Sequence, residues 1–266
     1  MAEARIPLIE TVDLKKYFKV GDKSYLHAVD GINMKVYPGE TIGVVGESGC
    51  GKSTLGRTIL RLIEPTSGQI LYNGEDITKL NARQMKRMRQ EMQIIFQDPY
   101  ASLDPRKSVI EIIAEYMIIN KTLPTKREIF NRAAHLMDVV GLARRYATAY
   151  PHELDGGRRQ RIGIARALSV NPKFIVCDEP VSALDVSIQA QILNLLMDLQ
   201  DCLLYTSCRN KRGCTLKLHR TGVKASFFAY TYIVRICILT HWALEFKIKM
   251  NELFCATQQK SLVSPS

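Results

Sequence analysis

The apolar and polar positions of the chain follow two different periods, and the mixture predicts strands interleaved with helices. Residues 8–12 and 33–37 alternate apolar and polar side chains, which is typical of half-buried strands. Residues 41–45, 92–96 and 172–177 are short apolar runs that predict buried strands. Apolar residues at helical spacing predict helices at 54–62, 156–168 and 188–199, and the charged segment 81–91 is interpreted as a solvated helix. Strands alternating with helices predict an α/β fold.

Residues 99–153 have a different character. Prolines at positions 99, 105 and 124 punctuate helical segments near 108–119, 126–140 and 142–148. We interpret this stretch as a small helical subdomain inserted into the α/β core. The predicted core comprises residues 1–98 and 160–201, and the helical insert comprises about 99–159.

A phosphate-binding loop is predicted between the strand at 41–45 and the helix at 54–62. The sequence there fits G-x-x-x-x-G-K-[ST]. Its glycines let backbone N–H groups wrap around phosphates, and the helix start adds a favourable dipole. Lys52 would neutralise the β- and γ-phosphates, and the Ser53 hydroxyl would ligate Mg²⁺. The predicted nucleotide-binding residues are Gly46, Glu47, Ser48, Gly49, Cys50, Gly51, Lys52, Ser53 and Thr54, with Cys50 as a small filler.

Two acidic residues end the apolar run at 174–177, where a phosphate-loop enzyme needs negative charge. Asp178 is the predicted Mg²⁺ ligand, and Glu179 is the predicted general base for an attacking water. Gln97 follows another predicted strand, and its amide can ligate Mg²⁺ or orient water. Taken alone, an apolar strand with two acids or a surface glutamine is commonplace, so these assignments depend on the phosphate loop.

A second anion site is predicted at Leu154-Asp155-Gly156-Gly157-Arg158. Asp155 is a good helix N-cap, and the two glycines expose N–H groups at the helix start. The alternative interpretation is a capped surface helix with a solvated arginine face.

Composition agrees with a globular domain but separates the last part of the chain. The formal charge of +11 suggests nucleic acid or a membrane surface, yet residues 202–266 carry +8 of it and residues 1–201 only +3. Five of the seven cysteines also lie in residues 202–266, and no pair has C-x-x-C spacing. We therefore expect neither nucleic-acid binding nor zinc. The N-terminus lacks the long apolar run of a signal peptide, which favours a reduced, cytosolic protein.

These motifs, in this order, resemble the ATP-binding subunits of ABC transporters over about residues 5–200. Residues 46–53 match Walker A, Gln97 begins the Q-loop, residues 154–158 match the signature, and Asp178-Glu179 end Walker B. Ser182-Ala183-Leu184-Asp185 resembles the D-loop. The stretch 96–106 is similar to the oligopeptide, dipeptide and nickel importer branch, and most similar to its second ATPase subunit.

The resemblance implies a P-loop NTPase fold, in which a RecA-like core with an antiparallel β subdomain carries the helical insert. It implies ATP and Mg²⁺ as cofactors, and Phe18 stacked on adenine, with Tyr17 as the alternative. It also implies that Asp155, Gly156, Gly157 and Asp185 face the nucleotide of a second subunit.

The implied partners are a homologous ATPase subunit, forming a heterodimer or a homodimer, two transmembrane permease subunits and an extracellular substrate-binding protein. The implied location is the cytoplasmic face of a bacterial-type plasma membrane, as a peripheral protein. The expected function is ATP hydrolysis that drives peptide import. The alternatives are a nucleotide-binding but hydrolytically impaired fragment, an importer ATPase for another cargo such as nickel, and a non-transport ABC ATPase.

Two departures from the family pattern stand out. The usual signature is L-S-G-G-Q, and here Asp155 and Arg158 replace its serine and glutamine. A carboxylate facing a γ-phosphate would repel it, so either Asp155 turns away as an N-cap, or Arg158 and Arg159 offset its charge. We expect the glycine N–H groups still to bind phosphate.

The second departure begins at Cys202, where the resemblance stops. The family implies a switch histidine near position 212, where the chain has Lys211-Arg212-Gly213, and neither His219 nor His241 is assigned this role. Residues 202–207 resemble a translated sequencing adapter. We therefore expect a C-terminally truncated domain with a chimeric or frameshifted tail, the alternative being a divergent native C-terminus. The apolar stretch 225–244 has Arg235 at its middle, and we predict no membrane span there.

Overall fold

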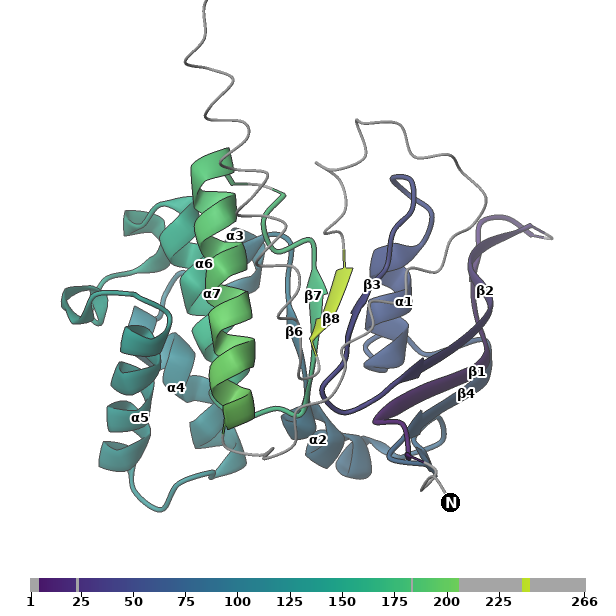
Figure 1. Ribbon diagram of the computed structural model, residues 1–266, viewed down its shortest axis with the longest axis horizontal. Helices are drawn as coiled ribbons and strands as arrows, with labels where there is room; N and C mark the ends of the chain where they lie inside the picture. The colour runs from purple at the N-terminus through teal and green to yellow at the C-terminus, as the bar shows by residue number, and fades with distance from the viewer. Residues whose placement is uncertain (1–4, 23, 183, 206–235, 240–266) are drawn as a thin grey trace, which may run out of the picture.

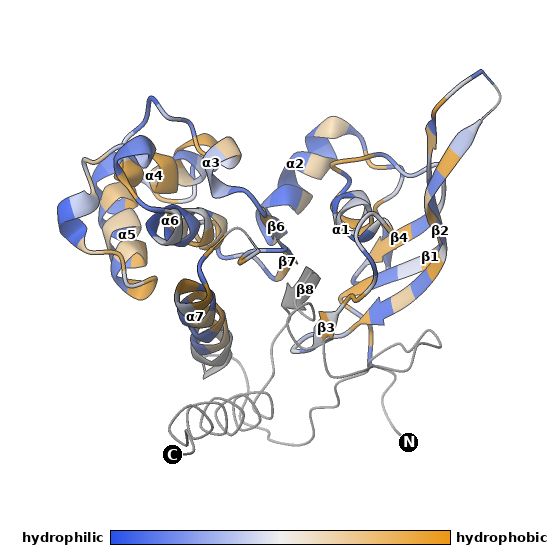
Figure 2. Ribbon diagram, turned by 90° about the horizontal axis from the view of Figure 1, so that it is seen from above, coloured by the Kyte–Doolittle hydropathy of each residue, from blue (hydrophilic) through white to orange (hydrophobic). Residues whose placement is uncertain are grey.

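The chain folds into two lobes on either side of a short central sheet (Figure 1). The computed structural model describes residues 5–22, 24–182, 184–205 and 236–239. An antiparallel sheet with helix α1 (Lys52–Ile59) forms one lobe, and helices α3 to α7 form the other. Seen from above, the two lobes lie apart and are joined through the central strands (Figure 2).

The antiparallel sheet has the strand order β2-β1-β4-β5. Its strands are β1 (Ile9–Lys19), β2 (Tyr25–Val36), β4 (Ser67–Tyr72) and β5 (Glu75–Asp76). β1 and β2 pair from Ile9↔Val36 to Lys19↔Tyr25, so both strands are longer than the apolar alternation predicted. Register shifts at Thr11/Leu14, Leu14/Lys16 and Lys16/Tyr17 break the alternation, which is why the pattern marks only part of each strand.

The central sheet has the order β3-β8-β7-β6. Its strands are β3 (Thr41–Gly43), β6 (Met92–Ile95), β7 (Phe174–Asp178) and β8 (Ile236–Leu239). β6 and β7 are parallel, whereas β8 runs antiparallel to both β3 and β7. β8 lies within the segment predicted to be foreign to the family. The rest of that segment after Tyr205, His219 and His241 included, lies outside the described residues, so its origin stays a prediction.

β7 is buried on both faces and separates two hydrophobic clusters. Phe174 and Val176 pack with the antiparallel sheet and α1, while Ile175 and Cys177 pack with the helical lobe. This arrangement explains why the strand reads as a continuous apolar run and places the acids at its end between the two lobes.

The helical lobe contains the segments of the predicted insert, 99–159, together with two helices that lie mostly in the predicted core. Its helices are α3 (Pro99–Ser102), α4 (Val109–Asn120), α5 (Lys126–Val139), α6 (Gly156–Leu168) and α7 (Val186–Tyr205), and α2 (Ala82–Glu91) precedes β6 in the chain. The helix expected at 142–148 is only a 3₁₀ turn, η1 (Arg144–Tyr146), and a second turn, η2 (Pro151–Glu153), follows it. The carbonyls of Ala147 and Ala149 accept from Ile110 and Val109 at the start of α4, which leaves no helical bonds to extend η1.

α7 also differs from the prediction, because it continues past Asp201 to Tyr205. Leu203 and Leu204 are good helix formers, so nothing local ends the helix at the predicted boundary. No helix among the described residues is long and apolar enough to span a membrane.

A partly exposed polar cluster joins the antiparallel sheet to α2 and to the start of β7. The Tyr72 hydroxyl donates to Glu91 Oε2 at 2.6 Å, and Lys173 Nζ pairs with the same oxygen at 2.8 Å. Burial raises the pKa of the Glu91 carboxyl, but the bonds from Lys173 and Tyr72 outweigh it and leave the pKa below its ordinary value. The ionised carboxylate therefore stabilises the junction of β4, α2 and β7.

A second tie fixes α6 against the segment that follows β6. Arg166 donates to the carbonyl of Ser102 and lies 5.9 Å from the ring centre of Tyr116. Burial lowers the pKa of the Arg166 guanidinium below its ordinary value.

Candidate functional site

The predicted phosphate loop lies between β3 and α1 and needs glycine at its end. Gly51 has φ of +93°, and a Cβ there would lie 1.9 Å from the carbonyl oxygen of Ala28 on β2. Gly49 also has a positive φ, of +80°. No side chain caps the start of α1, so its first N–H groups point at the loop as an anion site.

Lys52 is buried within this loop, with 6% of its surface exposed. Its ammonium donates to the carbonyl of Gly46 at 2.9 Å and to the carbonyl of Glu47, and it lies 3.5 Å from the Cys50 sulfur. Cys50 therefore contacts the lysine instead of merely filling space. A phosphate that entered the loop would replace these carbonyls as the lysine's partners.

Asp178 lies beside α1 and has one oxygen with no hydrogen-bond partner among the residues that the structure describes. Its Oδ2 pairs with Arg57 Nη2 at 3.1 Å, whereas its Oδ1 is buried and unbonded. The side chain is 1% exposed. Ser53 precedes Arg57 by one helical turn, so both lie on the face of α1 that meets Asp178. An unsatisfied buried carboxylate oxygen next to a hydroxyl-bearing helix start is suited to a cation.

Gln97 and Glu179, which are 82 residues apart, meet at the carboxyl ends of β6 and β7. Gln97 Nε2 donates to Glu179 Oε2 at 2.9 Å and to Ser182 Oγ at 3.1 Å. Glu179 has a φ of +47°, which is strained for a residue with a side chain. This strained conformation at the end of a buried strand is consistent with the predicted role of Glu179 as a general base.

The predicted aromatic residue Phe18 lies on β1 opposite Leu26, near the stretch of β2 that contacts Gly51. It is exposed, with Lys16 Nζ 5.0 Å from its ring centre. The alternative, Tyr17, stacks on His27 and donates its hydroxyl to Asp30 at 2.5 Å. Because the ring and hydroxyl of Tyr17 already contact His27 and Asp30, Phe18 is the better candidate for stacking on a nucleotide base.

The predicted second anion site forms the start of α6. The Asp155 carboxylate caps the helix by accepting from the Arg158 N–H at 2.8 Å, and it pairs with Arg158 Nη1 at 2.7 Å. Asp155 therefore acts as an N-cap, and Arg158 also offsets its negative charge. Arg159 does not contribute, because it donates to the Pro151 carbonyl and lies over the Tyr100 ring.

The start of α6 lies against α7 and not against the phosphate loop. A Cβ on Gly157 would lie 2.7 Å from Ile188, and one on Gly156 would lie 3.0 Å from Leu184. β6 and β7 separate α6 from α1 (Figure 1). Asp185 is exposed just before α7, and its role in nucleotide contact stays a prediction.

Strand, phosphate loop and helix, with two acids at the end of a neighbouring strand, define a P-loop nucleotide-binding protein. The ABC transporter family model matches residues 29–182 of the chain. The chain belongs to the ABC transporter family, and the predicted family and P-loop NTPase fold are confirmed.

Curated relatives show which members of this family the chain is similar to. It is 53% identical over 194 residues to the oligopeptide transport ATP-binding protein OppF of Bacillus subtilis (strain 168), covering 73% of this chain and 63% of OppF. It is 50% identical over 204 residues to AppF of the same organism, covering 73% of this chain and 61% of AppF. The chain thus spans about three fifths of the length of these curated relatives.

A solved structure supports the same fold. A dimeric ATP-binding cassette in a post-hydrolysis state, bound to ADP and Pi, is 29% identical with a TM-score of 0.66. The match covers 72% of this chain and 82% of that one.

Proposed function

We propose that this chain is the ATP-binding subunit of a peptide importer and that it hydrolyses ATP to drive transport. The observation that carries the proposal is the ion pair between Asp178 and Arg57 of α1, the helix that follows the phosphate loop, in a chain about half identical to OppF and AppF. The other proposed cargo is nickel, since the sequence of 96–106 is shared by both importer types.

Magnesium fits the residues at the end of β7. Ser53 and Asp178 would hold it, with Gln97 beside them, and the unbonded Asp178 Oδ1 supplies a free carboxylate oxygen. Bound there with a nucleotide, Mg²⁺ neutralises phosphate charge.

The chain's own residues would bind and activate the reactants. Lys52 would turn from the loop carbonyls to the β- and γ-phosphates, and the N–H groups at the start of α1 would bind the same anion. Glu179 would accept a proton from water, held in place by the Gln97 amide. Phe18 would stack on the adenine.

A second subunit would complete the site. The start of α6 and the phosphate loop lie on opposite sides of β6 and β7, so one chain does not bring them onto one nucleotide. A homologous ATPase subunit, paired head to tail, would supply the missing half, with Asp155, Gly156, Gly157 and Asp185 reaching the partner's ATP. Two permease subunits and an extracellular binding protein would complete an importer, with this chain at the cytoplasmic face of the plasma membrane.

Calorimetric titration of the full chain with ATP and Mg²⁺ tests the nucleotide site. We expect binding to the unmodified chain, loss of binding in Lys52→Ala, and no change in the matched control Lys86→Ala, an exposed lysine on α2. Binding that survives Lys52→Ala would overturn the assigned site.

Phosphate release, measured with the homologous ATPase and permease subunits present, tests the reaction. We expect Glu179→Gln to keep ATP binding and to lower hydrolysis at least about 100-fold, the usual contribution of a general base. Uptake of labelled peptide and of labelled nickel by the same assembly then identifies the cargo. ATP binding without phosphate release would favour the hydrolytically impaired alternative.

A further inference from the structure

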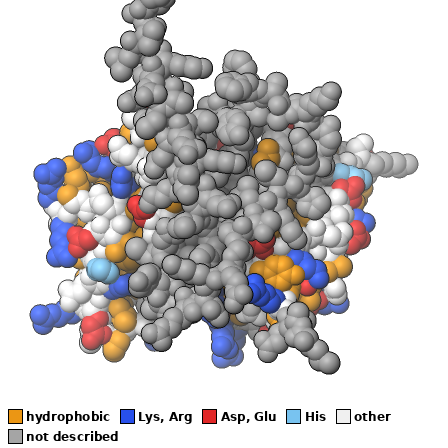
Figure 3. All heavy atoms as spheres, in the orientation of Figure 1, with side chains coloured by type: hydrophobic (Ala, Val, Ile, Leu, Met, Phe, Trp, Pro, Cys, Tyr) orange, Lys and Arg blue, Asp and Glu red, His pale blue; other side chains and the backbone are white. Residues whose placement is uncertain are grey.

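Helix α2 carries a basic face at the edge of the molecule between the two lobes (Figure 1). Met85 is 2% exposed, and Met88 packs partly against the same hydrophobic cluster. In a helix of 3.6 residues per turn, positions 83, 86 and 87 lie opposite positions 85 and 88. The exposed side chains on this outer side, which we call the α2 basic face, are Arg83, Lys86 and Arg87. Figure 3 shows Lys and Arg side chains at the lower edge of the molecule, where α2 lies.

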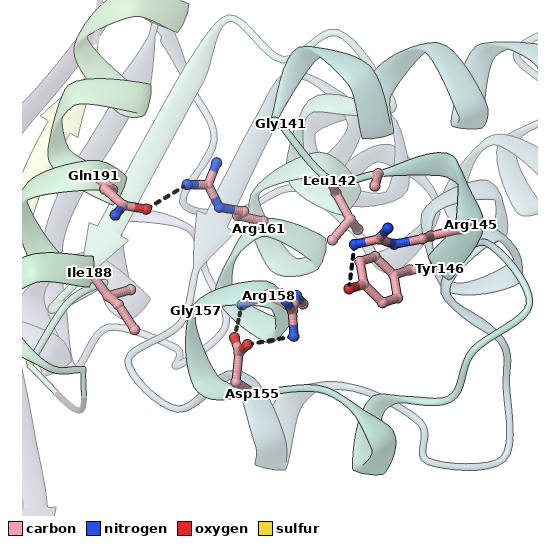
Figure 4. A pocket seen from close by; sticks show the side chains of 11 residues that line it. Gly141, Leu142, Arg145, Tyr146, Asp155, Gly157, Arg158, Arg161, Ile188 and Gln191 are labelled. Atoms are coloured by element: carbon pink, nitrogen blue, oxygen red, sulfur yellow. Dashed lines mark hydrogen bonds and ion pairs between the residues drawn. The ribbon is translucent and has the colours of Figure 1, made fainter.

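The α2 basic face has no counter-ion bonded to it within the part of the chain that the structure describes. The one carboxylate of α2, that of Glu91, is already bound by Lys173 and by the Tyr72 hydroxyl, and Arg87 acts on it only through space. The arginines that line a pocket of the helical lobe differ, because each is bonded to a side chain (Figure 4). Their partners are Tyr146 for Arg145, Asp155 for Arg158 and Gln191 for Arg161.

The cations of α2 occupy positions that weaken the helix. Lys86 and Arg87 follow Arg83 by three and four residues, so like charges adjoin on one face. Arg83 also lies in the first turn, near the positive end of the helix dipole, and that turn has no acidic residue. A capping box between Asn81 and Gln84, with both bonds at 2.9 Å, supports the helix start. An external anionic surface would relieve the repulsion that remains.

The composition of α2 favours a lipid surface over other anionic partners. A protein partner is usually held by a buried aromatic or apolar anchor, but the apolar side chains Met85 and Met88 lie on the side that faces the core. Single-stranded nucleic acid is bound by cations together with stacking aromatic residues, and α2 contains no aromatic residue. Anionic lipid headgroups require neither feature, since they attract exposed lysine and arginine side chains by charge alone.

We propose that the α2 basic face binds the anionic lipid headgroups of the membrane beside the transporter. The inference rests on the proposed function, because that function places the chain next to a membrane, and it adds a direct lipid contact. The face is remote from the nucleotide: α2 precedes the amino end of β6, whereas Gln97 follows the carboxyl end of β6. Lipid contact would therefore orient and retain the subunit at the membrane without taking part in ATP binding.

Flotation of the full chain with lipid vesicles, without ATP, tests the contact. We expect binding to vesicles of phosphatidylglycerol and phosphatidylcholine in equal parts, no binding to phosphatidylcholine alone, and loss of binding at high salt. The triple variant Arg83→Gln, Lys86→Gln, Arg87→Gln should bind about 100-fold more weakly, since each cation near an anionic surface contributes about fivefold. Arg87→Gln alone should weaken binding about fivefold, and it replaces the triple variant if thermal unfolding shows that the latter is not folded.

The matched control removes the same charge from three exposed positions of α5, by Lys126→Gln, Arg127→Gln and Arg132→Gln. It should leave vesicle affinity nearly unchanged. Both triple variants keep the net +8 of residues 202–266, so that segment contributes equally to each.

The outcomes separate this proposal from the proposed function. If the unmodified chain does not bind the anionic vesicles, if the α2 variant binds them as tightly as the unmodified chain, or if both triple variants weaken equally, lipid binding by α2 is overturned. Binding to soluble polyglutamate in place of vesicles would instead indicate an acidic protein partner and would also overturn it. Calorimetric titration of the α2 variant with ATP and Mg²⁺ should match that of the unmodified chain, and failure of both chains to bind ATP would count against the proposed function.

Discussion

The Arg57–Asp178 pair provides a direct test of the proposed magnesium site. Asp178 is 1% exposed, and Arg57 Nη2 at 3.1 Å is its one cationic partner among the described residues. Replacing Arg57 with leucine leaves a buried carboxylate without a compensating charge. We expect this change to destabilise the chain, and we expect a magnesium–nucleotide complex to compensate for most of the loss.

The magnitude follows from the distance and the exposure. Two unit charges at this separation attract by about 5 kcal/mol at an effective dielectric constant of about 20. Because 41% of the Arg57 side chain is exposed, water screens the pair, and we take the loss as about 2–3 kcal/mol. For a domain of this size, that loss lowers the melting temperature by about 4–12 °C.

Thermal unfolding in four conditions measures the effect: without ligand, with Mg²⁺, with ATP and EDTA, and with ATP and Mg²⁺. The difference in melting temperature between the unmodified chain and Arg57→Leu should shrink by more than half only with ATP and Mg²⁺ together. Arg83→Leu, an exposed arginine on α2, should show little difference in any condition. If ATP with EDTA closes the difference in melting temperature, or if ATP with Mg²⁺ leaves it unchanged, the proposed cation at Asp178 is refuted.

Three further changes follow from the structure. Asp155→Ser keeps an N-cap on α6 but removes the negative charge. ATP hydrolysis in the assembled importer should therefore rise several-fold. Unchanged hydrolysis would show that the pairing with Arg158 already neutralises the carboxylate. Arg166→Met leaves the Ser102 carbonyl unsatisfied and should lower the free energy of unfolding in urea by about 1–2 kcal/mol, with Arg132→Met as control. Because the pKa of Glu91 is depressed in the folded chain, its contribution is fully present above the unfolded value of about 4.3 and is lost as pH falls through the lower, folded value. Urea unfolding at pH 5 and pH 3 should therefore show a smaller loss of stability on acidification in Glu91→Gln than in the unmodified chain.

The sequence predicted those parts of the fold that local patterns determine. The helix at 156–168 lies where it was predicted, the buried strand β7 lies close to the apolar run at 172–177, and α2 lies within the charged segment 81–91. The phosphate loop was also evident, because its glycines and lysine are adjacent in the chain. Long-range pairing sets the remaining details, such as the full length of β1 and β2 and the reduction of 142–148 to a 3₁₀ turn.

The sequence did not reveal contacts between residues that are distant along the chain. Arg57 looks like any polar residue of a helix, and only the fold brings it to Asp178, 121 positions away. The bond from Gln97 to Ser182 and the pairing of Arg145 with Tyr146 at the pocket were likewise missed. Each depends on side-chain direction and on the packing of separate elements, which a local pattern does not encode.

The two helix starts that are predicted to bind anions differ in how they are capped. α1 presents uncapped N–H groups at the phosphate loop, whereas the Asp155 carboxylate at the start of α6 accepts from the Arg158 N–H and pairs with the Arg158 guanidinium. The two helix starts are therefore not equivalent: no side chain caps the first, whereas Asp155 caps the second. Any nucleotide shared with a second subunit must either displace Asp155 from Arg158 or bind beside the pair. In this chain the strength of that ion pair, more than the phosphate loop, is expected to set how readily the shared site closes.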